Sequence, residues 1–119
     1  MKIVIGIAAL FILIGCSAEI ERKPEPEGLI PKDKMVVVVR EMVKLESFVQ
    51  AKYVQVSTYH KAMVNSGDSL LLANKVTREQ YQASIDYYGS RQTELQEIYT
   101  EALEDLNQEL SKLEMEQNK

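Results

Sequence analysis

Apolar residues recur with a helical period along much of this sequence, and this pattern constrains the fold more than any other feature. On a helical wheel of about 100° per residue, the apolar residues between positions 35 and 64 fall in one broad stripe. The valines at 36–39 are also compatible with a buried strand, but the helical period continues for about thirty residues, far beyond the usual length of a strand. We therefore predict a first helix from Pro31 to about Val64, ended by the Asn-Ser-Gly-Asp sequence at 65–68.

A second helix is predicted from a capping pattern. Residues 69–74 fit only a short helical turn, and Thr77 and Gln80 then have the spacing of a capping box. In that motif, the hydroxyl of the first residue accepts a hydrogen bond from the backbone N–H of the fourth. We expect the helix to begin after Thr77 and to end at Gly89.

A last helix is predicted from about Gln92, because apolar residues stay in register from 95 to 113. Together these patterns predict an all-α fold. We expect a small antiparallel helical bundle of three to four helices at residues 30–119, preceded by a signal peptide and a flexible tether.

Charge is distributed unevenly over the predicted helices. Residues 32–78 contain eight basic and four acidic side chains, a net charge of +4, whereas residues 94–119 contain eight acidic and two basic ones, a net charge of −6. This complementarity favours placing the first and last helices side by side. The whole chain has a net charge of −4, which argues against nucleic acid as a partner, because such proteins present a basic patch.

The N-terminus has the features of a bacterial lipoprotein signal. Lys2 precedes an apolar run at 3–14, which is too short to span a bilayer, since spanning requires roughly 20 apolar residues. The run closes with Leu-Ile-Gly-Cys, which resembles the lipobox. An ordinary signal peptide with an incidental cysteine is the alternative. The resemblance implies a signal peptide at 1–15 and lipid attachment at Cys16, so that the membrane is a partner through the acylated cysteine.

The segment that follows is predicted to be a tether, at residues 16–29 with the lipidated cysteine included. It is rich in charge, and Pro24 and Pro26 favour an extended conformation. Residues 17–28 would span up to about 37 Å at roughly 3.1 Å per residue. We expect the helical domain to face the periplasm. Ser17 after the cysteine resembles lipoproteins exported to the outer membrane, and slightly favours that membrane over the inner one.

Several short motifs resemble the DUF4296 family of small lipoproteins from Bacteroidetes-type bacteria. They are Ile-Pro-x-Asp-Lys-Met-Val at 30–36, Glu-Met-x-x-Leu-Glu at 41–46, Thr-x-Glu-x-Tyr-x-x-Ser-x-x-Tyr-Tyr at 77–88 and Ile-Tyr at 98–99. The resemblance implies a helical envelope lipoprotein. It implies no activity, because the family has none assigned.

The chemistry-bearing residues do not assemble into a recognisable catalytic pattern. His60 is the only histidine, and Val56 and Val64 occupy the neighbouring turns of the predicted helix, so it gains no ligand or proton-transfer partner there. Cys16 is the only cysteine and is assigned to the lipid. We therefore predict that the protein is not an enzyme and that it has no cofactor and no metal.

Glu46 is the one carboxylate that falls inside the apolar stripe. We expect it to be mostly buried and to accept a hydrogen bond from Ser84, Tyr88 or Tyr99, because an unpaired buried charge is very costly. The alternatives are a solvated position at the edge of the stripe and a catalytic acid with a raised pKa. Tyrosines on inner helix faces are expected in the core, although a stacking platform for sugars is the alternative.

The predicted first helix has more apolar surface than one dry face requires. Val37, Phe48 and Tyr59 align on one flank, about 200–240° from Met35. Either the helix is central, with neighbours on both flanks, or this flank is a partner site. We favour the partner site. The expected function is a membrane-anchored, non-enzymatic accessory or protein-interaction module with an envelope protein as its partner. The alternative is a binding or chaperone-like module that shields an apolar ligand or chain in the periplasm.

Overall fold

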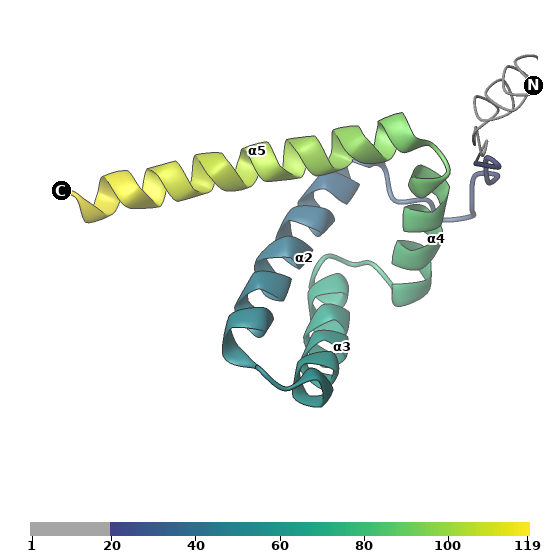
Figure 1. Cartoon of the computed structure of the whole chain (residues 1–119). Helices are drawn as coiled ribbons and strands as arrows, with labels where there is room; N and C mark the ends of the chain where they lie inside the picture. Colours follow the sequence, from purple (N-terminus) through teal and green to yellow (C-terminus); the bar gives the residue numbers. More distant parts are fainter. Residues whose placement is uncertain (1–19) are drawn as a thin grey trace, which may run out of the picture.

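Residues 20–119 are described by the computed structural model, and they form four helices and no strand (Figure 1). The prediction of an all-α helical bundle is confirmed. The signal peptide at 1–15 and Cys16 lie outside the described residues. Within the described part, no helix is both long and apolar enough to cross a membrane. The helices are α2 (Lys32–Lys52), α3 (Val56–Ala73), α4 (Arg78–Gly89) and α5 (Gln92–Gln117).

The predicted first helix is in fact a helical hairpin. α2 ends at Lys52, residues 53–55 reverse the chain, and α3 returns antiparallel to α2 (Figure 1). Tyr53 has extended backbone angles, and its N–H donates to the carbonyl oxygen of Val49 to close the last turn. The prediction of one helix to Val64 is therefore wrong. A hairpin satisfies the same apolar period, because the two halves of the stripe can pack against each other.

The predicted helix end at 65–68 is also wrong, because Gly67 lies buried inside α3. A Cβ atom at Gly67 would be 3.9 Å from the Met42 Sδ atom, an ordinary van der Waals distance, so Met42 of α2 lies beside Gly67. The turn predicted at 69–74 is the last part of α3. The helix ends instead at a Schellman motif in which Lys75 has a φ of 57° and the Val76 N–H donates to the Leu71 carbonyl oxygen.

The capping box at the start of α4 is confirmed. The Thr77 Oγ1 atom accepts a hydrogen bond from the Gln80 backbone N–H at 3.1 Å, and the Gln80 side chain accepts one from the Thr77 N–H at 3.0 Å. These bonds satisfy two of the backbone donors that a helix N-terminus leaves unpaired.

Thr77→Ala is expected to lower the free energy of unfolding by about 0.5–2 kcal/mol, because it removes the cap from α4. Chemical denaturation followed by circular dichroism measures the change. Thr100→Ala is the matched control, since this threonine is exposed in the middle of α5. An equal loss in both variants would show that the cap does not stabilise the fold.

The first and last helices lie side by side, as the charge distribution predicted. Three basic residues of α2 pair with acidic residues of α5, and each of the three has a partner that lies 65 positions further along the sequence. The constant offset shows that α2 and α5 run parallel, which differs from the antiparallel arrangement expected between neighbours. The pairs are Lys32–Glu97 at 2.6 Å, Arg40–Asp105 at 3.4 Å and Lys44–Glu109 at 3.0 Å.

The core lies where the first half of α2 meets α4 and the first half of α5. Met35 and Val38 of α2 and Ile98 and Ala102 of α5 are fully buried there. Beyond this junction α2 diverges from α5, and the second half of α5 projects past the other helices (Figure 1). About half of α5 therefore contributes little to the core.

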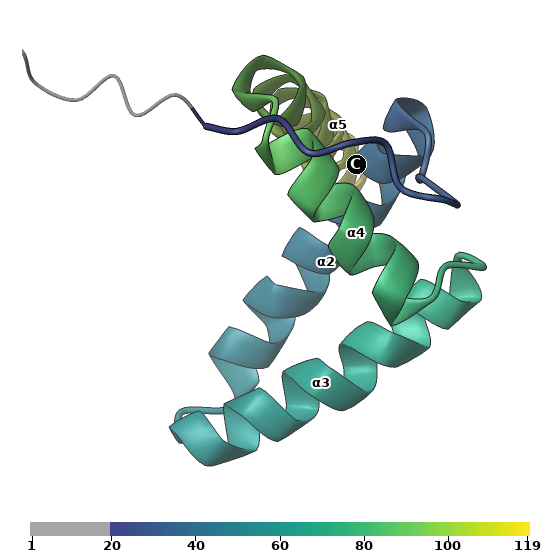
Figure 2. The ribbon, with the colours of Figure 1, turned by 90° about the vertical axis from the view of Figure 1, so that its right-hand side faces the viewer.

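The chain before α2 packs against the domain, so the tether prediction is wrong for residues 23–28. The Lys23 N–H donates to the Ser90 Oγ atom at 3.0 Å, and the Arg91 guanidinium donates to the Lys23 carbonyl oxygen at 2.9 Å. Figure 2 shows this segment, in dark purple and blue, running across α4. The Pro- and Glu-rich composition suggested a solvated chain, but backbone groups of the segment find side-chain partners at the C-terminal end of α4. We call residues 20–31 the strap.

Candidate functional site

The exposed part of α5 carries a regular row of apolar side chains. They are spaced alternately by four and three residues, which is the seven-residue repeat of a helix that pairs with another helix. Most of the row is exposed, with Leu103 at 50%, Leu110 at 56% and Leu113 at 49%. We define the α5 seam as Tyr99, Leu103, Leu106, Leu110 and Leu113.

The seam is uncovered because α2 packs on a different face of α5. The face toward α2 is marked by Ile98 and Ala102, which are fully buried, and by Glu109, which is paired with Lys44. On a helical wheel, the seam is centred about 100° from Ile98. The burial of Ile98 and Ala102 thus sets the rotation of α5, with the ion pairs on the same face, and leaves the seam free.

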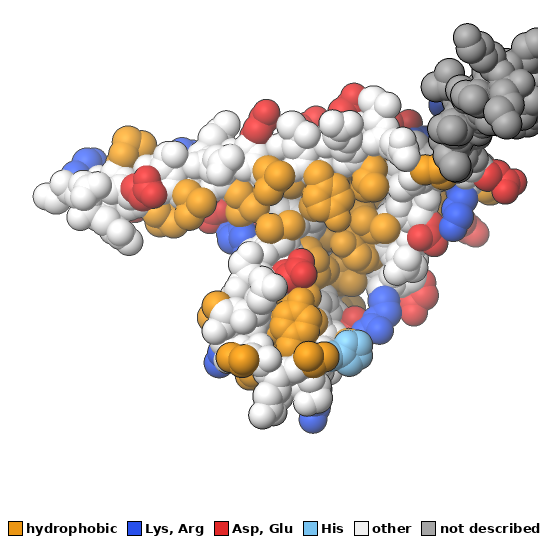
Figure 3. All heavy atoms as spheres, viewed as in Figure 1, with side chains coloured by type: hydrophobic (Ala, Val, Ile, Leu, Met, Phe, Trp, Pro, Cys, Tyr) orange, Lys and Arg blue, Asp and Glu red, His pale blue; other side chains and the backbone are white. Residues whose placement is uncertain are grey.

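Where α2 and α5 diverge, the seam forms one wall of an open groove. The groove has a volume of about 350 Å³. In Figure 3, hydrophobic side chains follow the lower edge of α5 and continue into the angle between the helices. The groove is lined by Val43, Lys44 and Ser47 of α2 and by Leu106, Glu109, Leu110 and Leu113 of α5.

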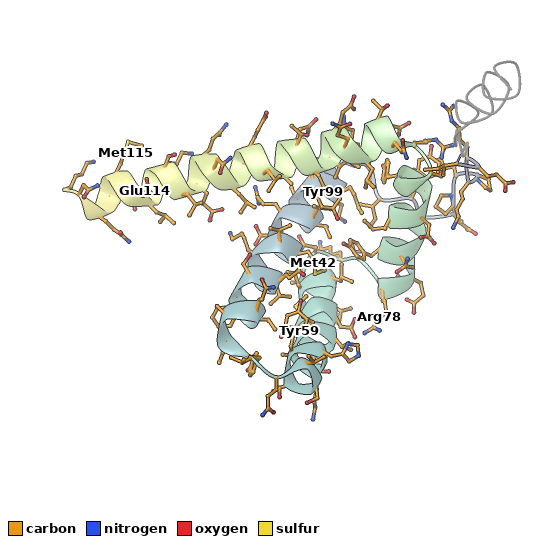
Figure 4. The ribbon with its side chains drawn as sticks, viewed as in Figure 1. Met42, Tyr59, Arg78, Tyr99, Glu114 and Met115 are labelled. Atoms are coloured by element: carbon orange, nitrogen blue, oxygen red, sulfur yellow. The ribbon has the colours of Figure 1, made fainter. Side chains whose placement is uncertain are left out.

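Between α3 and α5 the molecule is open. Among the described residues, no Cα atom of α3 comes within 8 Å of one in α5. Tyr99 of α5 and Tyr59 of α3 lie on the same face of the molecule, above and below Met42 in Figure 4. Met42 and Tyr81 line one shallow hollow of about 270 Å³. Each of the three tyrosines comes from a different helix.

Glu46 of α2 belongs to this tyrosine cluster. The Tyr59 hydroxyl donates a hydrogen bond to the Glu46 carboxylate at 3.2 Å. Burial raises the pKa of Tyr81 to about 12, and the nearby Tyr99 and Glu46 act in the same direction. The pKa of Tyr59 is also raised, first by desolvation and then by the charge of Glu46. The cluster therefore presents protonated phenols and a carboxylate on an open surface.

The prediction that Glu46 is buried and bonded to Ser84, Tyr88 or Tyr99 is wrong. Glu46 is exposed, and its hydrogen-bond partner is Tyr59. The reason is the chain reversal at 53–55, which brings α3 across this face of α2. Tyr99 is 41% exposed and forms one end of the seam.

Ser84 and Tyr88 are buried, but they hold the strap. The Ser84 Oγ atom accepts a hydrogen bond from the Ile30 N–H at 3.0 Å, and the Tyr88 hydroxyl donates to the Ile30 carbonyl oxygen at 2.7 Å. Burial raises the pKa of Tyr88, which keeps its hydroxyl protonated as a donor. These two side chains satisfy both backbone groups of a residue that is almost fully buried.

The predicted partner patch of Val37, Phe48 and Tyr59 is not one surface. Val37 and Phe48 lie on α2, whereas Tyr59 lies on α3. Phe48 is 61% exposed, and the other two are half-buried. Glu46 and Phe48 are about 200° apart on the wheel of α2, so Tyr59, which bonds to Glu46, lies on the opposite side of α2 from Phe48. The patch required a single continuous helix.

The helical period of the α5 leucines predicts that they face the core, so the sequence does not reveal the seam. Periodicity alone does not distinguish a row of apolar residues that faces the core from one that is exposed on the surface. His60 is exposed on α3. The part of the chain that the structure describes contains no group of three His, Cys, Asp or Glu side chains able to hold a metal ion.

Comparison with known proteins identifies a family for this chain. No curated protein and no solved structure is significantly similar to it. The family described as "Domain of unknown function (DUF4296)" matches residues 26–112, which include the last part of the strap, the first three helices and most of α5. The chain therefore belongs to the DUF4296 family.

Proposed function

We propose that this protein is a lipid-anchored, non-enzymatic module of the bacterial cell envelope that binds another protein through the α5 seam. The observation that carries the proposal is the exposure of Leu103, Leu110 and Leu113 in one regular row. Contiguous apolar surface of this kind in a folded domain marks an interaction site. The core lies elsewhere, around Met35 and Ile98, so the seam is not needed to hold the domain together.

The anchor supports the same proposal from the sequence. The apolar run before Cys16 ends in a lipobox-like sequence, and acylation of Cys16 would attach the domain to a membrane. A module on a membrane meets envelope proteins repeatedly, so even a modest docking surface suffices for association. The periplasm is the proposed compartment.

Cys16→Ser is expected to abolish lipid attachment. Wild-type protein produced in its host should incorporate radioactive palmitate and sediment with membranes, whereas the variant should do neither, because the thiol is the acceptor of the lipid. Ser17→Ala is the matched control and should keep the label. A Cys16→Ser variant that carries label would refute the anchor.

Leu110→Asp is expected to abolish binding of the partner protein without unfolding the domain. The charge would be placed in the middle of the seam, where a docked protein would bury it at high cost. Co-purification of the full chain from detergent-solubilised host membranes, with its partners identified by mass spectrometry, measures the loss.

Met115→Asp is the matched control, because Met115 is 61% exposed on the same helix and about 160° from the centre of the seam. A partner recovered with wild type and Met115→Asp but lost with Leu110→Asp supports the proposal. Equal recovery with all three proteins contradicts it.

A second candidate function is favoured by the groove between α2 and α5. Its volume of about 350 Å³ lies within the range of small-molecule sites, and four of its lining residues are apolar. In this alternative the module shields an apolar ligand or chain. Native mass spectrometry of the purified protein distinguishes the two functions, since a bound small molecule adds a defined mass.

A further inference from the structure

The α5 seam carries information about the shape of its partner. A row spaced four and three residues apart along a straight helix is complementary to a second helix with the same repeat, because each side chain then inserts between those of the neighbour. A sheet edge or a loop offers no matching spacing. The spacing therefore indicates that the partner docks a helix on the seam, an inference that rests on the proposed function.

The charges beside the seam are not all neutralised. The acidic residues of α5 that face α2 are paired with Lys32, Arg40 and Lys44. Glu114 and Glu116, by contrast, form no ion pair with any described residue. In the seven-residue repeat they occupy the two positions that flank the apolar row, where a partner's charges meet them.

A third carboxylate lacks a cation at the other end of the seam. Glu46 forms no ion pair within residues 20–119, and its only hydrogen bond is the one from Tyr59. Tyr59 and Tyr99, the first residue of the seam, lie on the same face of the molecule (Figure 4), so Glu46 lies on the face toward which the seam begins. A carboxylate among tyrosine rings suits an ammonium or guanidinium group, which the rings attract as well.

A second copy of this chain is a poor occupant of the seam. Two parallel α5 helices would place Glu109 of one copy beside Glu114 of the other. Two antiparallel ones would bring Glu114 and Glu116 of the second copy toward Glu46. Like charges across an interface oppose association. The same charges favour a basic partner.

We propose that the α5 seam binds a basic amphipathic helix of an envelope protein, with its apolar side chains on the leucines of the seam and a lysine or arginine beside Glu46. The flanking Glu114 and Glu116 pair with further basic residues of that helix. Recognition thus combines a long apolar contact with carboxylates at both ends.

Three synthetic helical peptides test this proposal. They share leucines at seven-residue spacing and differ only in their flanking residues, which are lysine, glutamine or glutamate. Binding to the full chain, purified in a nonionic detergent, is measured by fluorescence anisotropy. The lysine peptide is expected to bind at least about tenfold more tightly than the glutamate peptide, corresponding to about 1.4 kcal/mol.

Two variants locate the contact, and a third is the control. Leu110→Asp is expected to abolish binding of the lysine peptide, and Met115→Asp to leave it unchanged, which also controls for binding to detergent alone. Glu46→Gln should lower the affinity for the lysine peptide about three- to tenfold and leave the affinity for the glutamine peptide unchanged. Circular dichroism confirms that each variant is folded.

Other results of these experiments would contradict the basic-helix proposal without contradicting the proposed function. Equal affinity for all three peptides, lost in Leu110→Asp, would mean that the seam docks helices but does not select basic ones. If none of the three peptides binds, the inference is overturned. The proposed function is then still tested separately by the co-purification experiment. A dimer detected by sedimentation and dissociated by Leu110→Asp would make a second copy the occupant and also overturn it.

Discussion

Ile98→Ala is expected to lower the free energy of unfolding by about 2–5 kcal/mol, because it truncates a fully buried core side chain. Ile98 is fully buried between α5 and α2, and its removal leaves a cavity that the rigid junction cannot close. Urea denaturation followed by circular dichroism measures the change. The effect should appear in the midpoint of the transition rather than in its slope.

Leu110→Ala is the matched control, because this leucine lies on the same helix and is 56% exposed. Its substitution is expected to change the free energy of unfolding by no more than about 0.5 kcal/mol. The contrast between the two variants tests the division of α5 into a core half and a docking half. A large loss from Leu110→Ala would show that the seam is covered in the folded protein.

Tyr88→Phe is expected to lower the free energy of unfolding by about 1–3 kcal/mol. The ring remains in the core, but the Ile30 carbonyl oxygen loses the hydroxyl that donates to it at 2.7 Å. A buried acceptor without a donor retains the full cost of its removal from water. Thermal or urea denaturation provides the measurement.

Tyr87→Phe provides the comparison for Tyr88→Phe. Tyr87 is adjacent and half-buried, and its hydroxyl makes no hydrogen bond to any described residue. We expect its removal to be close to neutral. If both phenylalanine variants were equally stable, the bond to Ile30 would contribute nothing and the strap would not be held by Tyr88.

Local signals were sufficient to predict parts of this fold. The capping box at Thr77 depends on two side chains within four residues, and the pairing of α2 with α5 follows from opposite net charges. In both cases the interacting groups are visible in the sequence. The long period of apolar residues likewise predicted helices correctly, although it did not show where they end.

The remaining features depend on contacts that no local pattern contains. The chain reverses at 53–55 without glycine or proline, and Gly67 lies buried within α3, beside Met42 of α2, rather than at the end of a helix. The true end of α3 places a lysine, Lys75, in the left-handed conformation that usually favours glycine. The hairpin brings Tyr59 to Glu46 and leaves the seam outside the core, and neither result is visible in the helical period of the sequence.

The strap has a consequence for the distance between the proposed lipid anchor and the docking face. Its contacts at Ser90 and Arg91 hold the chain beside the start of α5, so that only residues 16–22 remain to connect a lipidated Cys16, a length of at most about 25 Å. From Gln92, α5 then carries Leu110 about 27 Å away, at 1.5 Å per residue. With the proposed anchor at one end and the proposed docking face toward the other, α5 would act as a rigid spacer. The length of this helix, rather than a flexible linker, would set the distance between the point of attachment and the partner.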